Sequence, residues 1–166
     1  MLQGGFTLVQ LLVALVVAAL LLHLATPAFY PLVQGHRRQV AANELLSGLR
    51  SARVAAITEG QRVSLRPIEG DWSRGWQMLV EAEGTDPDRY PVLAHRRSSG
   101  VRIVGNHWVG EAVRFNSMGV PAMANGRFHF CDPGEALSHL QVVIAPSGRI
   151  RLQAEPSQQP LCEKAP

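Results

Sequence analysis

Two arginines that follow a turn late in the chain have the types and spacing that could do chemistry. Residues 146–148 read Pro-Ser-Gly, which are turn-forming types, and Arg149 and Arg151 come directly after them. Ile150 and Leu152 suit the core face, so both arginines must point to the opposite face, about 6.6 Å apart at ~3.3 Å per strand residue. Two phosphate steps on one DNA strand advance about 6.8 Å, and a planar guanidinium binds phosphate oxygens bidentately. The spacing therefore allows both side chains to reach one nucleic-acid backbone.

The same pattern has a plainer interpretation, in which Arg149 and Arg151 form the solvated face of an ordinary strand. On spacing alone this second interpretation is favoured. Two phosphate contacts change the slope of log K against log salt concentration by only about two. Non-specific binding has a Kd of about 10⁻⁴ to 10⁻⁶ M. One copy would therefore be a weak, sequence-indifferent binder that needs further copies or further cations. The candidates for supporting cations are Arg96, Arg97, Arg102 and Lys164.

The two cysteines, Cys131 and Cys162, lie late in the chain and have no metal-ligand spacing around them. Pairing them would close a loop of about 30 residues and stabilise the fold by roughly 3 to 4 kcal/mol in the chain-entropy account. Such a bond persists in an oxidising compartment. The alternative, two unrelated buried thiols, stays open on this evidence.

No pattern of residues predicts catalysis. The six histidines show neither H-x-x-x-H spacing nor clustering with cysteine, so we expect no metal site and no cofactor. There is no nucleophile elbow, and no glycine-rich phosphate loop follows a strand. Trp72, Trp76 and Trp108 could stack on bases, but tryptophans of a core or sheet are the more common case. The sequence therefore predicts a protein that is not an enzyme.

The N-terminal element has the composition of a lipid-embedded segment. No Asp, Glu, Lys or Arg occurs before Arg37, so all 29 charged residues (16 basic and 13 acidic) fall in the last 130 positions. Residues 6–25 are almost wholly apolar, and twenty helical residues span about 30 Å, the thickness of a bilayer's hydrocarbon core. A cleaved secretory signal fits poorly, because the start has no basic residue and the apolar block is long. We expect a retained membrane helix over residues 6–29.

Beyond this segment the pattern predicts a continuing helix and then a sheet. Six apolar residues at helical spacing form one stripe, whereas Arg50 and Arg53 lie off it, and Glu59-Gly60 ends the run. The stripe consists of Ala42, Leu45, Leu46, Leu49, Ala52 and Ala56. Alternation with period two follows, interrupted by turn residues. We expect an α+β fold in which a long N-terminal helix, membrane-spanning in its first half, packs on an antiparallel β-sheet.

The first ten residues, MLQGGFTLVQ, consist of a short leader that ends in glycine, followed by Phe-Thr-Leu and the start of the apolar helix. This start resembles that of a type IV prepilin or pseudopilin, and Pro27 stands where many pilins carry a helix-kinking proline. The resemblance implies that a prepilin peptidase cleaves after Gly5 and methylates the new N-terminal Phe6. It also implies a helix held in inner-membrane lipid until the subunit enters a filament, with the globular domain in the periplasm.

Two features depart from that resemblance, and a third bears on orientation. The leader lacks the basic residue usual in prepilins. Gln10 stands where the family nearly always has Glu, and glutamine keeps hydrogen bonding but removes a charge that would pair with a neighbouring subunit. This favours a tip or low-abundance subunit, or else a substitution of little effect. Arg37 and Arg38, just beyond the apolar segment, would favour a cytoplasmic domain by the positive-inside tendency.

Three stretches of the second half resemble the GspH/FimT group of minor pilins and pseudopilins. They are FNSMGVP at 115–121, FCD at 130–132 and VVIAPSGRIR at 142–151. The resemblance implies that Cys131 and Cys162 form a disulfide. In the FimT-like branch a Gly-Arg-x-Arg strand is linked to DNA binding during natural transformation, which here implies Gly148, Arg149 and Arg151.

We therefore expect a minor type IV pilin that binds DNA non-specifically through that motif and takes part in DNA uptake and pilus biogenesis. Its expected partners are other pilins in a filament, the prepilin peptidase, DNA, and inner-membrane lipid before assembly. The alternative is a tip or priming subunit of a type IV pilus or type II secretion pseudopilus with no nucleic-acid contact. The expected organisation is a leader (1–5), a membrane helix (6–29), the soluble half of that helix (30–59) and a β-rich periplasmic domain (60–166). The expected location is the inner membrane, with a single pass, and later a periplasmic or surface filament.

Overall fold

The computed structural model describes most of the chain. It leaves out residues 1–6, 83, 85, 87–89, 98–99, 123–124, 158–159 and 163–166, and the side chains of residues 22–30 and 97. The described elements are α1 (Leu8–Glu59), β1 (Arg62–Ile68), β2 (Asp71–Glu81), β3 (Val92–Arg97), β4 (Ile103–Gly105), β5 (Val113–Phe115), β6 (Gly126–Phe130), β7 (Leu140–Ile144) and β8 (Ile150–Gln153). The chain divides into two compact units, one up to His36 and one from Arg37 onward, and each is described by itself.

In the first unit, α1 begins with a reciprocal cap. The Thr7 backbone N–H donates to the Gln10 side-chain oxygen at 3.1 Å, and the Gln10 backbone N–H donates to the Thr7 hydroxyl at 3.3 Å. This arrangement is a capping box, in which two side chains satisfy backbone N–H groups that the first helical turn leaves without partners. The residue at position 10 is therefore bonded locally at the helix start.

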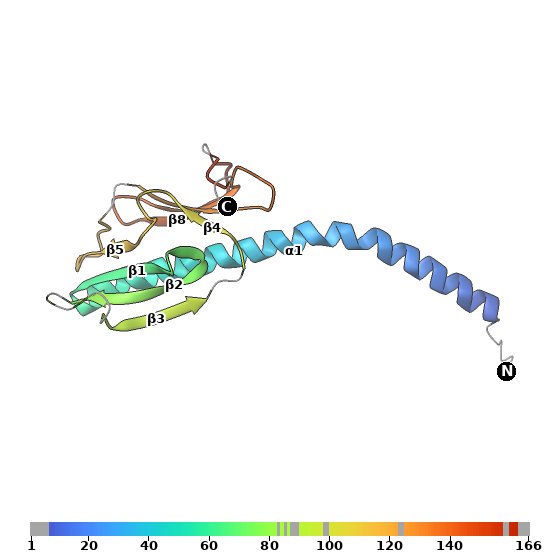
Figure 1. The fold of residues 1–166 in the computed structure, drawn as a ribbon, viewed down its shortest axis with the longest axis horizontal. Coiled ribbons are helices and arrows are strands. Elements are labelled where there is room, and N and C mark those ends of the chain that lie inside the picture. Colours follow the sequence, from blue (N-terminus) through green and yellow to red (C-terminus); the bar gives the residue numbers. More distant parts are fainter. Residues whose placement is uncertain are drawn as a thin grey trace. The chain divides into compact units, whose positions relative to one another are not determined.

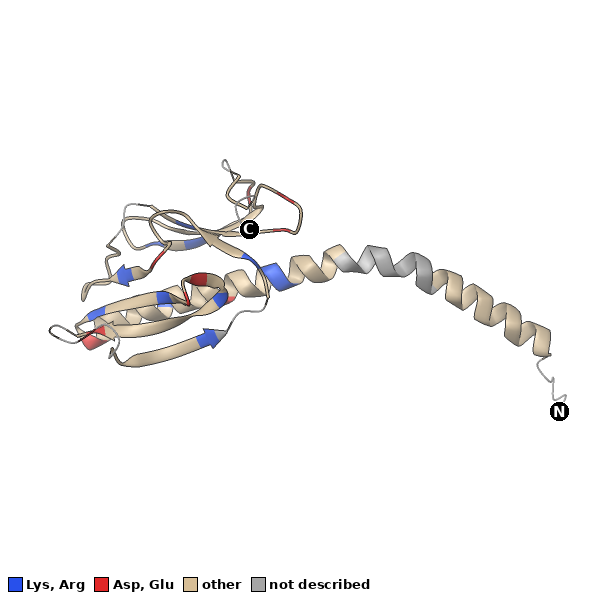
Figure 2. Cartoon of the chain, viewed as in Figure 1, with Lys and Arg blue, Asp and Glu red and all other residues tan. Residues whose placement is uncertain are grey.

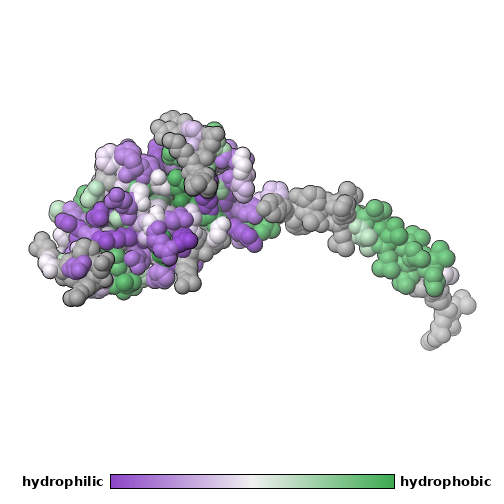
Figure 3. Space-filling view, in the orientation of Figure 1, coloured by the Kyte–Doolittle hydropathy of each residue, from purple (hydrophilic) through white to green (hydrophobic). Residues whose placement is uncertain are grey.

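The apolar side chains of this first stretch of α1 are exposed, and Figure 3 shows them as a continuous hydrophobic surface. Within the part of the chain whose side chains are described, no helix is long and apolar enough to cross a membrane. The predicted span, residues 6–29, extends over Phe6 and the side chains of residues 22–29, which lie outside the described residues. The predicted cleavage site at Gly5 lies outside them too.

In the second unit, α1 packs through the predicted apolar stripe. Ala42, Leu49, Ala52 and Ala56 are fully buried and Leu45 nearly so, while Leu46 packs against this core from its edge. The helix ends at Glu59, as the Glu59-Gly60 pair predicts. The periodicity of the sequence thus identified the face of α1 that enters the core.

Two four-stranded antiparallel sheets complete the second unit, in the orders β3-β2-β1-β5 and β4-β6-β7-β8. Figure 1 shows β1, β2 and β3 along one side of the helix, with β4 and β8 in the other sheet. The core cluster joins α1 to both sheets, through residues such as Leu65 and Phe128. The predicted fold class, a helix packed on antiparallel strands, is confirmed. The division of the strands between two sheets is a feature that the alternation did not indicate.

Candidate functional site

The turn between β7 and β8 presents the two predicted arginines. The Gly148 N–H donates to the Ala145 carbonyl and the Ala145 N–H donates to the Arg149 carbonyl, both at 2.9 Å. Gly148 has φ +78°, a left-handed conformation that closes a three-residue hairpin loop and that glycine adopts without steric cost. Arg149 and Arg151 are exposed, and Ile150 between them is buried. The prediction that Ile150 faces the core and that Arg149 and Arg151 point outward is therefore confirmed.

A second turn, between β5 and β6, repeats this hydrogen-bond pattern. The Gly119 N–H donates to the Asn116 carbonyl at 2.8 Å, and the Asn116 N–H donates to the Val120 carbonyl at 3.0 Å. Gly119 also has a positive φ, +73°. The Asn116 side-chain oxygen accepts from the N–H groups of Met118 at 3.0 Å and Val120 at 2.9 Å, which fixes the loop. The two turns are thus built alike, although 29 positions separate their glycines in the sequence.

Arg53 of α1 joins the two turns. Its Nε donates to the Gly119 carbonyl at 2.9 Å and its Nη1 donates to the Gly148 carbonyl at 3.0 Å. A Cβ atom on Gly148 would lie 3.0 Å from the Gly119 carbonyl oxygen and 3.2 Å from Arg53 Nε, so glycine is needed for this close approach as well as for its φ. The motif that carries Arg149 is therefore positioned by a guanidinium of the helix.

The sequence analysis did not single out Arg53, because it lies off the apolar stripe. In the structure it is half-buried. The available signal was the pair of turn sequences Asn-Ser-Met-Gly and Ala-Pro-Ser-Gly, each of which ends in a glycine that offers a carbonyl. Only the fold shows that the two carbonyls face one helix residue.

A cavity of about 450 Å³ lies between α1 and the β7–β8 turn. It is lined by Arg50, Arg53, Val54 and residues 147–150, and no carboxylate is among these lining residues. Arg50 Nη2 donates to the Ile150 carbonyl at 3.4 Å, the long end of the hydrogen-bond range. We call this cavity the arginine cleft.

Most other described arginines lie in salt bridges with carboxylates. Arg38 pairs with Asp132, Arg74 with Glu69 and Arg96 with Glu44. Arg66, Arg114 and Arg62 lie 2.9, 3.2 and 4.0 Å from Glu81. Among the described residues, no salt bridge includes Arg50, Arg53, Arg149 or Arg151, so positive charge is left uncompensated around the cleft. Figure 2 shows how basic and acidic residues are distributed over the second unit.

One carboxylate, that of Glu81, is shared by three of these arginines. Burial alone would raise the pKa of Glu81, but the hydrogen bond from Arg66 and the nearby Arg114, by its charge and its hydrogen bond, together lower it. Glu81 therefore stays ionised and binds its arginines, which gives this part of the first sheet a structural role.

The four predicted supporting cations do not gather at the cleft. Arg96 is held by Glu44. The Arg97 side chain and Lys164 lie outside the described residues. Arg102 is half-buried and lines a different cavity. The cations that the structure places beside Arg149 are instead Arg50 and Arg53 of α1.

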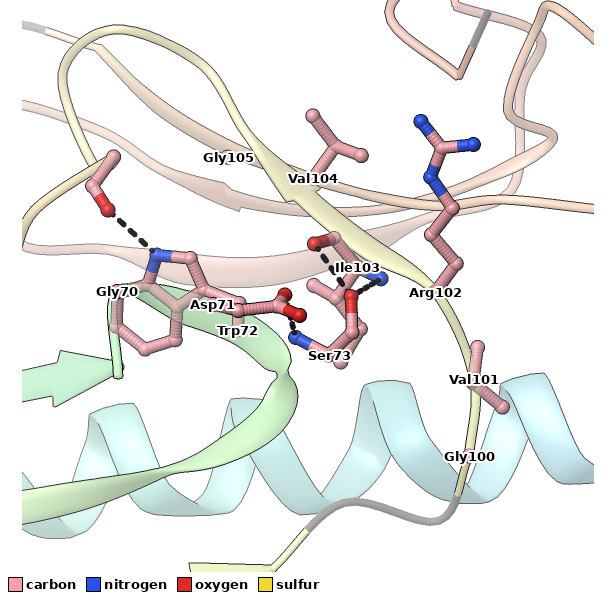
Figure 4. Close-up of a pocket in the computed structure, with 11 residues that line it drawn as sticks. Gly70, Asp71, Trp72, Ser73, Gly100, Val101, Arg102, Ile103, Val104 and Gly105 are labelled. Carbon is pink, nitrogen blue, oxygen red and sulfur yellow. Dashed lines mark hydrogen bonds between the residues drawn. The ribbon is translucent and has the colours of Figure 1, made fainter. Parts of the chain in front are cut away.

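That other cavity, of about 630 Å³, lies where β2 approaches β4 (Figure 4). The Trp72 indole N–H donates to the Val109 carbonyl at 2.9 Å, and the Ser73 hydroxyl accepts from the Ile103 N–H at 3.0 Å. The Arg102 guanidinium points away from Trp72 and Ser73 (Figure 4). The Ser73 bond joins β2 to β4 of the other sheet, and the Trp72 bond joins β2 to the connection after β4, so we assign this cavity a structural role.

Cys131 and Cys162 form a disulfide, with their Cα atoms 5.5 Å apart. The segment after β8 is also held by hydrogen bonds from the Ser157 N–H to the Ser138 carbonyl at 2.8 Å and from the Cys162 N–H to the Ala136 carbonyl at 3.1 Å. The predicted pairing is confirmed, and the open alternative of two free thiols is excluded. Among the described side chains, no three His, Cys, Asp or Glu residues gather as a metal site.

Comparisons with known proteins agree with this architecture. Residues 41–148 match the family model described as Type II transport protein GspH, a stretch that contains Arg50, Arg53, Gly119 and Gly148. None of the curated proteins compared with the chain matches it.

Solved structures of similar fold include the following three. Two are of the type IV minor pilin FimU of Pseudomonas aeruginosa PAO1. One is 22% identical, with a TM-score of 0.63 over 80% of this chain and 99% of that chain. The other is 23% identical, with a TM-score of 0.61 over 75% and 98%. The minor pseudopilin EpsH of Vibrio cholerae is 15% identical, with a TM-score of 0.54 over 71% and 96%.

Proposed function

This chain belongs to the family of the type II transport protein GspH, and from that premise we propose that it is a minor type IV pilin that binds DNA non-specifically through Gly148, Arg149 and Arg151. It shares its fold with minor pilins and pseudopilins. In this proposal it assembles with other pilins in a filament and takes part in pilus biogenesis and in DNA uptake during natural transformation. The role is one of structure and binding rather than catalysis.

The observation that carries the DNA assignment is the state of Arg149 and Arg151. Both are exposed on a turn and strand fixed by the helix, and no salt bridge among the described residues includes either. Within the described part of the chain, the one side-chain hydrogen bond of Arg151 is a 3.5 Å contact with Gln153. Both guanidinia can therefore exchange water for phosphate oxygens without first breaking an ion pair.

We also propose that the N-terminal segment is processed and anchored as in prepilins. Cleavage after Gly5 and methylation of Phe6 by the prepilin peptidase would leave a methylated terminal amine, which is cationic near neutral pH, at the start of an apolar helix that passes once through the inner membrane. The exposed apolar side chains of α1 in the first unit support this. The Cys131–Cys162 disulfide supports a periplasmic second unit, because disulfides persist in oxidising compartments.

Gln10 favours a second candidate, a tip or priming subunit of a pilus or pseudopilus with no nucleic-acid contact. Its side-chain oxygen is bonded to the Thr7 N–H, and glutamine offers no charge to a neighbouring subunit. Such a subunit would not need the ion pair that residues within a filament shaft would use. This candidate shares the fold and the anchor with the first and differs in leaving Arg149 and Arg151 without a function.

Binding of the full chain in detergent to a short DNA duplex, followed by fluorescence anisotropy, tests the DNA assignment. We expect Arg149→Gln/Arg151→Gln to reduce the affinity and to lower the salt slope, the change in log K with log salt, by about two. The matched control is Arg37→Gln/Arg74→Gln, which removes the same charge away from the cleft and should nearly keep the wild-type slope. Equal slopes in the wild type and the motif variant would overturn the DNA assignment and favour the structural alternative.

A further inference from the structure

We propose that the arginine cleft is a phosphate-binding site in which Arg50 of α1 contributes a third contact to the DNA backbone beside Arg149 and Arg151. This inference rests on the proposed DNA binding and adds a residue that lies about one hundred positions earlier in the chain. The ligand class is a phosphodiester oxyanion. Arg50 would contact a phosphate of the DNA backbone that neighbours the phosphates bound by Arg149 and Arg151.

The position of Arg50 supports the site. Its guanidinium donates to the carbonyl of Ile150, the residue between the two motif arginines. Arg149 lines the same cleft. The fold has therefore placed a helix guanidinium against the backbone of the strand that carries the other two.

The helix arginines differ in how tightly they are held. Arg53 makes two good hydrogen bonds, at 2.9 and 3.0 Å, and is half-buried, so its role is to position the turns. Arg50 is exposed, and its one side-chain hydrogen bond to another described residue is long, at 3.4 Å. A guanidinium has five N–H donors, so Arg50 keeps most of its donors for a ligand. Arg50 is thus the helix residue available to bind.

The positive charge of the cleft favours binding of an anion. Arg50, Arg53 and Arg149 line it without a carboxylate, whereas six other described arginines are paired with Asp or Glu. Concentrated, uncompensated guanidinia bind phosphate by charge and by their planar fork. Two contacts predict a salt slope of about −1.8 and three predict about −2.7, so the third contact is measurable.

The salt slope of the full chain in detergent tests the site. We expect Arg50→Gln to lower the slope by about one, Arg50→Lys to retain it with weaker binding, and Arg37→Gln to leave it near the wild-type value. Arg37 is the matched control because it is an exposed arginine of α1 that does not line the cleft. Thermal melting of each variant verifies that the fold is kept.

Phenylglyoxal modification, located by mass spectrometry, gives a second readout that needs no variant. DNA should protect Arg50 and Arg149 together, and should leave Arg37 reactive. Protection of Arg149 without Arg50, or an unchanged slope in Arg50→Gln, would overturn the third contact and leave the motif assignment intact. Protection of neither, with an unchanged slope in Arg149→Gln/Arg151→Gln, would overturn both.

Discussion

At the scale of single residues, Gly148 suits both the backbone conformation of its turn and the close packing around it. Its φ of +78° suits glycine, and the space where a Cβ would lie is bounded by the Gly119 carbonyl and the Arg53 guanidinium. The residue before the two arginines is therefore set by geometry, whatever the arginines bind. A glycine at this position of the motif follows from the fold alone.

The variant Gly148→Ala should destabilise the protein more than a backbone penalty alone. A non-glycine residue in the left-handed region costs about 1 to 3 kcal/mol, and the contacts at 3.0 and 3.2 Å add to it. Gly134→Ala is the matched control, because Gly134 has φ +81° but nothing within 4 Å of its Cβ position. Denaturant unfolding measures both, and equal losses would show that the close approach carries no energy.

His129 predicts a pH dependence of stability. Burial first, and then the charge of Arg127, lower the pKa of His129 below its usual range. In the unfolded chain the histidine binds a proton near pH 6.5, so the unfolded state holds more protons just below that pH. The free energy of unfolding should therefore fall as the pH drops below about 6.5, until the folded pKa is reached.

Thermal melting of the wild type and of His129→Gln between pH 8 and pH 5 tests this expectation. Glutamine does not titrate, so the variant should lose less stability over this range than the wild type. Parallel curves for the two proteins would show that His129 is not the group responsible. The difference in stability between the two proteins at pH 8 gives the packing cost of the substitution. This difference must be subtracted from the differences measured at lower pH.

At the scale of elements, the sequence predicted what depends on local periodicity. The stripe from Ala42 to Ala56 is buried as expected, and the alternation around Ile150 places the arginines outward. The pairing of β1 with β5 and of β4 with β6 could not be read from the sequence, because it depends on which distant strands meet. The Arg53 hydrogen bonds could not be read from the sequence either, because they join α1 to turns 66 and 95 residues away.

The variant Arg53→Met should loosen both turns at once. Methionine keeps most of the aliphatic stem but removes the donors to Gly119 and Gly148, and losing hydrogen bonds from a charged group costs about 1 to 3 kcal/mol. Hydrogen exchange at the Gly119 and Gly148 N–H groups should accelerate together. Arg37→Met is the control, and loosening of one turn alone would contradict a shared clamp.

At the scale of the whole molecule, the net charge is less informative about DNA binding than the positions of the arginines that have no carboxylate partner. The formal charge is only +3. Within the described residues, arginines of the first sheet lie in salt bridges with carboxylates, whereas Arg50, Arg53 and Arg149 line the cleft without one. Several subunits in one filament would present several such clefts, and avidity would then turn weak single contacts into capture.

The disulfide is the covalent constraint on this whole unit, and its removal should affect stability more than binding. Cys131 and Cys162 are 31 residues apart, and the chain-entropy account gives about 3 to 4 kcal/mol for closing such a loop. We expect Cys131→Ser/Cys162→Ser to lower the free energy of unfolding by about this amount. Because neither cysteine lines the arginine cleft, the salt slope of DNA binding at a temperature where the variant is folded should stay at the wild-type value. A reductant should shift the wild type to the variant's melting temperature and leave the variant unchanged, and a shift in both would mean that the reductant acts elsewhere.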